Sequence, residues 1–243
     1  MHNHSRQLSS MKNTKGFTLV EILVSSAIAM LMLGTIYLAI QSAQRSSSGM
    51  ERKVTAQHDA RGALEIMAME IRMASYNPTF ATGMWMNPTN CVASSPNETY
   101  KGIQAATASS ISVEMDICCT AGDGDGALND PNEIITYNYV TAERYITRNT
   151  NCGGAMPFLG DATAATTPRT TRVINTDLGM PLFRYYDGAG TEIAAASLPA
   201  AIPNIRVIDI ALAVETEEID PSTGQRRRMV YSTRVIPRNH AIQ

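Results

Sequence analysis

The longest apolar stretch of the chain lies near its N-terminus, at residues 17–40. Glu21 is the one charged residue in this stretch. An α-helix rises about 1.5 Å per residue, so a helix of this length covers the ~30 Å hydrocarbon core of a bilayer. We therefore expect a transmembrane helix here.

After residue 40 the sequence becomes polar, but apolar side chains return further along at helical spacing. They recur every three or four residues: Ala60, Leu64, Met67, Ile71 and Ala74. This spacing is typical of an amphipathic helix, and the first proline of the chain is Pro78. The pattern predicts one helix of about 60 residues, over residues 17–77, which is far longer than the average globular helix. A break near residues 46–49, where serines precede a glycine, would instead give two helices.

In the C-terminal half the apolar period changes to two, which indicates β-strands. Strand-like segments are found at residues 111–115, 135–139, 144–148, 172–174, 181–186, 205–215 and 229–235. The last two flank the turn Ser222-Thr223-Gly224 and predict a hairpin. A sheet with one apolar face can cover the apolar stripe of the helix. We therefore predict an α+β fold with a β-rich head over residues 78–243, in which residues 79–110 form an irregular connection.

Composition limits the functions that the chain can have. With 243 residues, it is long enough for one sizeable head and an extended element. Its net charge of −2 gives no general positive excess for a polyanion, so nucleic acid is not an expected partner. Three consecutive arginines, at residues 226–228, are interpreted as a solvated turn. The histidines are scattered along the chain: His2, His4, His58 and His240. No nucleophile has an evident base, and we expect neither enzymatic activity nor a required cofactor.

The segment ahead of the apolar stretch is basic. It contains Arg6, Lys12 and Lys15 and no acidic residue. By the positive-inside rule this flank stays in the cytoplasm, so the remainder of the chain is expected to be exported.

All cysteines fall in the part that we expect to be exported, where disulfides can form. They are Cys91, Cys118, Cys119 and Cys152. A bond between adjacent cysteines needs strained geometry, so Cys118 and Cys119 are each expected to pair with Cys91 or Cys152. A metal site is the alternative, but no Cys-x-x-Cys pair or nearby histidine supports it.

The junction between the basic flank and the apolar stretch reads KGFTLVEILVS, at residues 15–25. A small residue such as Gly16 lets a protease approach the backbone, and the basic flank holds this bond at the cytoplasmic face of the membrane. The junction resembles that of type IV prepilins and pseudopilins. The resemblance implies that prepilin peptidase removes residues 1–16 and leaves a methylated amine on Phe17. It also implies that Glu21 neutralises the amine of a neighbouring subunit.

Other interpretations of this junction remain open. A secretory signal peptide is cut after its apolar run, but the candidate site Ala27-Ile28-Ala29 lies in the middle of the run. A carboxylate inside an apolar span costs about 2.5–3.5 kcal/mol and needs a partner, unless Glu21 reaches the headgroups. The leader is long if Met1 is the true start, and Met11 is the alternative. No proline interrupts the first half of the helix, which leaves any kink to Gly34.

The overall layout is similar to PilW-type minor pilins and to J-type pseudopilins of type II secretion. The resemblance implies a single-pass protein of the bacterial inner membrane that later joins a pilus at the cell surface. The implied partners are other pilins, prepilin peptidase, the inner-membrane assembly platform and, before assembly, membrane lipid. A membrane-anchored periplasmic enzyme or binding domain, without a filament, is the alternative from another class.

An acidic loop, DGDGALNDPNE, occupies residues 123–133. Its candidate ligands for Ca²⁺ are Asp123, Asp125, Asn129, Asp130 and Glu133. The EF-hand template does not fit, because aligning Gly126 with its glycine puts Ala121 at the first ligand position and Asn132 at the last. Similar loops in related minor pilins and pseudopilins favour calcium, and a solvated turn between strands is the alternative.

Overall fold

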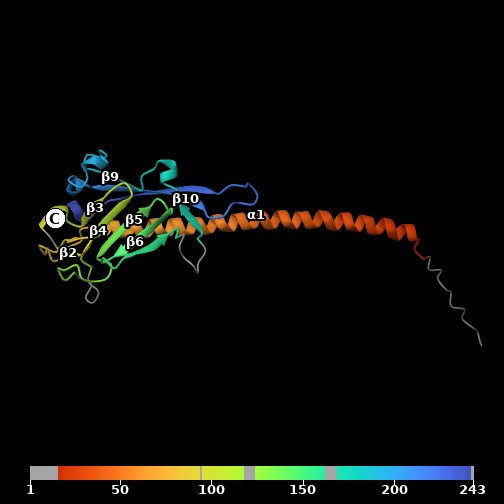
Figure 1. The fold of residues 1–243 in the computed structure, drawn as a ribbon, viewed down its shortest axis with the longest axis horizontal. Helices are drawn as coiled ribbons and strands as arrows, with labels where there is room; N and C mark the ends of the chain where they lie inside the picture. Colours follow the sequence, from red (N-terminus) through yellow and green to blue (C-terminus); the bar gives the residue numbers. More distant parts are fainter. Residues whose placement is uncertain (1–15, 94, 118–123, 162–168, 242–243) are drawn as a thin grey trace, which may run out of the picture. The chain divides into compact units, whose positions relative to one another are not determined.

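The computed structural model describes residues 16–93, 95–117, 124–161 and 169–241. Its long helix, α1 (Leu19–Met73), has 55 residues and continues through residues 46–49 without a break (Figure 1). The prediction of one continuous helix is confirmed. The helix is shorter than residues 17–77, because Thr18 caps its start and Ser75, with a φ of 64°, lies beyond its end. The chain divides into two units, Met1–Ser47 and Ser48–Gln243, and the head lies in the second.

In its described residues the head contains two antiparallel sheets and a short hairpin. The first sheet follows chain order: β3 (Ile103–Ala106), β4 (Ser110–Glu114), β5 (Ile134–Val140), β6 (Tyr145–Thr150) and β7 (Ala155–Leu159). In the second sheet, β10 (Val207–Thr216) pairs with β11 (Arg228–Val235), β8 (Thr171–Val173) and β9 (Phe183–Tyr186). This arrangement confirms the α+β prediction.

Short elements complete the head. They are β1 (Met86–Asn87), β2 (Val92–Ala93), α2 (Ser95–Tyr100) and the 3₁₀ helices η1 (Thr176–Leu178), η2 (Ala195–Ser197), η3 (Ile202–Asn204) and η4 (Arg238–Ala241). Residues 79–110, expected to be irregular, contain β1, β2, α2 and β3. Elements of two to six residues are too short to establish a recognisable hydrophobic period.

The apolar stripe of α1 forms the centre of the core, where it packs with both sheets. Its buried residues are Ala56, Ala60, Ala63, Leu64, Met67, Ala68 and Ile71. The alanines let the strands approach the helix closely. On β10, Ile208, Ile210, Leu212 and Val214 alternate with other residues and are fully buried. Apolar burial contributes about 25 cal/mol per Å², so this stripe is the main attachment of the sheets to α1.

A polar clamp adds to this attachment. Arg148 on β6 donates from Nη2 to Glu70 Oε1 on α1 at 2.6 Å, and the Tyr137 hydroxyl on β5 donates to Glu70 Oε2. Arg148 also donates to Asn132 at 3.0 Å. Burial, together with the nearby Glu70, raises the pKa of Tyr137, so this phenol remains a donor. The clamp therefore fixes α1 against β5 and β6 of the first sheet.

The disulfide joins Cys91 to Cys152, with their Cα atoms 6.0 Å apart. The prediction that Cys118 and Cys119 each pair with one of these cysteines is therefore wrong. The turn between β6 and β7 brings Cys152 beside the β1–β2 turn, where its sulfur lies 3.4 Å from the carbonyl oxygen of Pro88. This places the two Cα atoms within the usual range for a disulfide. Cys118 and Cys119 lie outside the described residues.

Gly49 is a point of close contact between α1 and the loop after β10. It is buried, and a Cβ built on it would lie 2.9 Å from Asp220 Oδ1 and 3.2 Å from Asp220 Cγ. Asp220 cannot easily retreat, because its Oδ2 accepts from Arg227 Nε at 2.7 Å and its Oδ1 accepts from the Ser222 amide at 2.8 Å. The absence of a side chain at Gly49 therefore lets the loop pack on the helix.

Gly49→Ala is expected to destabilise the head by about 1 kcal/mol, although the same change in an open helix stabilises by about 0.5–1 kcal/mol. Gly62→Ala is the matched control, because an added Cβ there meets no atom within 4 Å. The measurement is the unfolding midpoint, followed by the fluorescence of the single tryptophan, Trp85, whose exposed fraction is 3%. Equal stabilisation by the two substitutions would contradict the close contact.

His240 fastens the C-terminal η4 to the end of α1. Its Nε2 donates to the carbonyl oxygen of Ile202 at 2.9 Å, which leaves Nδ1 to accept from the Ser75 hydroxyl at 2.9 Å. The Gly102 amide donates to Ser75 Oγ at 3.0 Å. His240 is 1% exposed, and burial lowers its pKa to about 4. Because this serine and histidine are both buried and hydrogen-bonded, their contact serves packing.

The neutral state of His240 makes head stability sensitive to acid. The unfolded chain binds a proton there near pH 6.5, whereas the folded head resists protonation down to about pH 4. The free energy of unfolding of the wild type, relative to His240→Asn, should therefore fall by about 3 kcal/mol between pH 6.5 and 4. Denaturant titrations at several pH values measure this difference. A difference that does not change with pH would show that His240 is not held neutral.

Candidate functional site

The N-terminal end of α1 is closed by a capping box, formed by Thr18 and Glu21. Thr18 Oγ1 accepts from the Glu21 amide at 3.2 Å, and Glu21 Oε2 accepts from the Thr18 amide at 3.2 Å. The Thr18 hydroxyl also donates to Glu21 Oε2 at 3.2 Å. Two amides that a helix start leaves without partners are thus satisfied within a single turn. Glu21 was predicted from the sequence but Thr18 was not, although the pattern Thr-x-x-Glu before an apolar run predicts this box.

The first turn of α1 also brings the helix dipole and the carboxylate of Glu21 together. The N-terminus of a helix carries partial positive charge, which a carboxylate in the first turn stabilises. Glu21 is in this position, and Gly16 and Phe17 lie just ahead of the cap in nonhelical backbone. An amine created at Phe17 would lie next to the cap, where the helix dipole disfavours positive charge. The carboxylate of Glu21 is therefore the residue that can compensate such an amine.

The first half of α1 is apolar and exposed. Phe17 is 83% exposed, and large side chains exposed by more than half follow it: Leu19, Val20, Ile22, Leu23, Val24, Ile28, Met30, Leu31, Met32, Leu33, Ile36, Tyr37, Leu38 and Ile40. Among the described residues, α1 is the one helix long and apolar enough to cross a membrane. A surface of this kind needs an apolar environment, either lipid or other helices.

Carboxylates of the acidic loop accept hydrogen bonds from backbone amides. Buried Glu133 accepts from the Ile117 amide at 2.9 Å and from the Asp130 amide at 2.7 Å. Burial raises its pKa. Asp125 Oδ1 accepts from the Ala127 amide at 2.9 Å. These contacts hold together the described part of the loop.

A further carboxylate, Asp116, was not among the predicted ligands. It accepts from the amides of Asp125 and Gly126 at 3.0 and 2.9 Å. No group of three or more acidic, histidine or cysteine side chains in the described part of the chain is placed to hold a metal. Asp123 lies outside that part. Calcium binding by Asp123, Asp125, Asn129, Asp130 and Glu133 thus stays a prediction.

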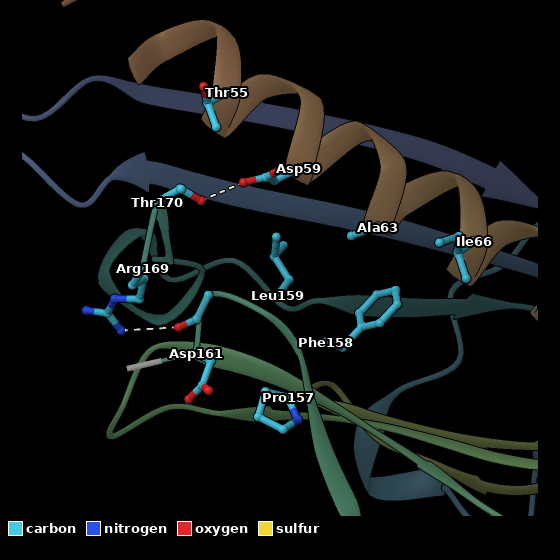
Figure 2. A pocket seen from close by; sticks show the side chains of 11 residues that line it. Thr55, Asp59, Ala63, Ile66, Pro157, Phe158, Leu159, Asp161, Arg169 and Thr170 are labelled. Carbon is cyan, nitrogen blue, oxygen red and sulfur yellow. Dashed lines mark hydrogen bonds between the residues drawn. The ribbon is translucent and has the colours of Figure 1, made fainter. Parts of the chain in front are cut away.

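The head also carries an open groove between α1 and β7, with a volume of about 570 Å³ (Figure 2). Ala63 and Ile66 on the helix lie opposite Phe158 and Leu159, and at one end Thr170 donates to Asp59 at 2.5 Å. The described lining contains no histidine, cysteine or serine. The groove therefore combines apolar side chains with the polar Asp59, Asp161, Arg169 and Thr170.

One comparison with known proteins bears on this site. A family model described as the prokaryotic N-terminal methylation motif matches residues 11–37. No curated protein and no solved structure matches the chain. The matched segment includes Gly16, Phe17, the capping box and most of the exposed apolar stretch. It supports processing by prepilin peptidase and assembly with other pilins, and the apolar helix is consistent with anchoring in the inner membrane. By this N-terminal segment the chain is type IV pilin-like.

Proposed function

We propose that the chain is a PilW-type minor pilin, which is cut before Phe17 and enters a type IV pilus to initiate or cap it. The observation that carries the proposal is the methylation motif on a helix whose apolar residues are exposed. Burying a large apolar side chain is worth about 1.5–3 kcal/mol, so this helix requires cover along its length. Lipid supplies the cover before assembly, and the helices of neighbouring subunits supply it afterwards. We place the basic flank in the cytoplasm and the head in the periplasm.

Glu21 has two roles in this proposal. In the single chain it closes the capping box with Thr18. In the filament its carboxylate pairs with the amine of a neighbouring Phe17, in a setting with little water. Leaving either charge unpaired there would cost several kcal/mol, so the pair selects the axial register of the subunit.

The first test concerns processing. Gly16→Leu places a large side chain before the scissile bond and is expected to block cleavage, so that residues 1–16 remain. An added Cβ meets no atom within 4 Å at Gly16 or at Gly34, so Gly34→Leu is the matched control and should be cleaved normally. The measurement is the intact mass of the membrane-extracted protein, with and without prepilin peptidase. A mature chain that starts at Ser5, Met11 or Ala27 in both strains would contradict the proposal.

The second test separates the charge of Glu21 from its capping role. Glutamine also closes a capping box, so Glu21→Gln keeps the cap and removes the charge. Thr18→Ala removes the cap at a cost of about 1 kcal/mol and keeps the charge. We expect Glu21→Gln to abolish incorporation into sheared pili and Thr18→Ala to lower it only a few-fold, as measured by immunoblotting. The reverse order would show that helix capping, rather than charge pairing, governs assembly.

A deletion strain distinguishes the minor pilin from the J-type pseudopilin. Loss of surface pili with normal secretion supports the pilus assignment. Loss of secretion with normal pili would contradict it, whereas the processing result is shared by both classes.

A further inference from the structure

A second groove in the head is rich in arginine. It has a volume of about 820 Å³ and lies beside the start of β11. The arginines that line it are Arg144, Arg172, Arg226, Arg227 and Arg228. They come from the β5–β6 turn, from β8 and from the segment that begins β11, so the fold collects them from three places.

The charges in this groove are not balanced. The Glu215 side chain is 5% exposed and lies within 4 Å of three guanidinium groups, at 3.3 Å from Arg228, 3.7 Å from Arg226 and 3.9 Å from Arg144. Arg144 also contacts Asp177 at 3.1 Å.

The other two arginines are each close to another carboxylate, although Arg172 shares Glu217 with Arg169. Arg172 pairs with Glu217 at 2.5 Å and Arg227 with Asp220 at 2.6 Å. Because Arg226 and Arg228 share Glu215, a positive excess lies on these two arginines. Arg228 is 60% exposed, so its remaining donors face solvent.

Guanidinium groups arranged in this way suit a phosphate. Their planar forks donate in pairs to phosphate or carboxylate oxygens, and several of them around one anion give a stronger site than isolated lysines would. The nearby carboxylates and the net charge of −2 limit the field that a long polyanion would meet. The groove therefore fits a small anionic group better than a nucleic acid.

The loop beside this groove is attached to α1 a short way along the chain from the apolar stretch. The loop that precedes β11 is fastened to α1, because Arg52 pairs with Glu218 at 2.5 Å and donates to the carbonyl oxygen of Ile219 at 3.3 Å. Gly49, where the loop packs, follows the end of the apolar stretch at Ile40 by nine residues. Even fully extended, such a segment spans only about 30 Å.

The loop contributes an apolar side chain as well. Ile219 lines the groove and is 53% exposed. A neighbouring apolar and basic surface is typical of segments that lie at a bilayer interface. We propose that the groove of Arg226, Arg228 and Arg144 binds the phosphate of an anionic phospholipid headgroup while the chain is in the membrane. The proposal rests on membrane anchoring and does not depend on the filament.

The test uses the full chain in nonionic detergent and counts bound lipids by native mass spectrometry. Phosphatidylglycerol is the anionic probe, and phosphatidylcholine is the zwitterionic control. Wild type is expected to bind phosphatidylglycerol about tenfold more tightly, and Arg226→Gln with Arg228→Gln to lose this preference. The matched control is Arg184→Gln with Arg234→Gln, which removes the same charge from exposed arginines of the same sheet and should keep the preference.

Several outcomes would overturn the proposal. Equal binding of the two lipids by the wild type would do so without relying on any variant. An equal loss in the control pair would show a general charge effect. Displacement of the lipid by millimolar inorganic phosphate would indicate a site for a free anion, and displacement by short duplex DNA would indicate a nucleic-acid site. Since the assay requires no pili, its failure leaves the processing and assembly tests unaffected.

Discussion

The burial of one helical stripe determines the rest of the head. The stripe from Ala56 to Ile71 is the surface against which both sheets pack, and four of its seven buried residues are alanine. Small side chains bring the strands close to the helix, so packing density rather than side-chain volume stabilises the contact. Because each sheet covers the helix with its apolar face, loss of the stripe would leave two amphipathic sheets without a partner. The helix is therefore the centre of the domain and not an appendage to it.

Each polar contact with α1 fixes a different degree of freedom. The Glu70–Arg148 pair joins the helix to the first sheet, and the close approach of Asp220 at Gly49 joins it to the second. Ser75, just past the helix end, holds the C-terminal η4 through His240. Apolar packing tolerates sliding more readily than hydrogen bonds do. These contacts therefore set the position of the sheets along α1, whereas the stripe supplies most of the stabilising free energy.

The features that the sequence predicts are those that depend on local spacing. The continuous helix, its buried stripe and the alternation along β10 follow from periods of 3.6 and two residues. The methylation motif is equally local, and the prediction of Gly16, Phe17 and Glu21 as site residues needs no tertiary information. The capping partner Thr18 was available by the same reasoning, because it lies three residues before Glu21.

The contacts that could not be predicted are those between segments far apart in the sequence. Ser75 and His240 are separated by 165 residues, and Cys91 and Cys152 by 61. Contacts across such sequence separations leave no periodic pattern in the sequence. Which cysteines pair depends on which segments the fold brings together. Gly49 illustrates the difference. A glycine has low helix propensity and so predicts a weak point in the helix. In the folded head the missing side chain of Gly49 instead leaves room for Asp220.

Two buried ionisable groups give the head opposing responses to pH. Glu114 is fully buried and accepts from the Met86 amide at 3.0 Å. Burial raises its pKa to about 8. Its contribution to stability is therefore fully present below pH 4.5 and is lost as the pH rises through 8. His240 acts in the opposite sense, since its contribution is lost as the pH falls from 6.5 through about 4. Between pH 4.5 and 6.5 the two groups change the free energy of unfolding in opposite directions. In the unfolded chain Glu114 has lost its proton and His240 still binds one, whereas in the folded head Glu114 keeps its proton and His240 has none. A head that contained only one of these groups would vary in stability across this whole interval. The contributions of Glu114 and His240 therefore partly cancel in mildly acidic surroundings, whereas above pH 6.5 Glu114 acts without an opposing histidine.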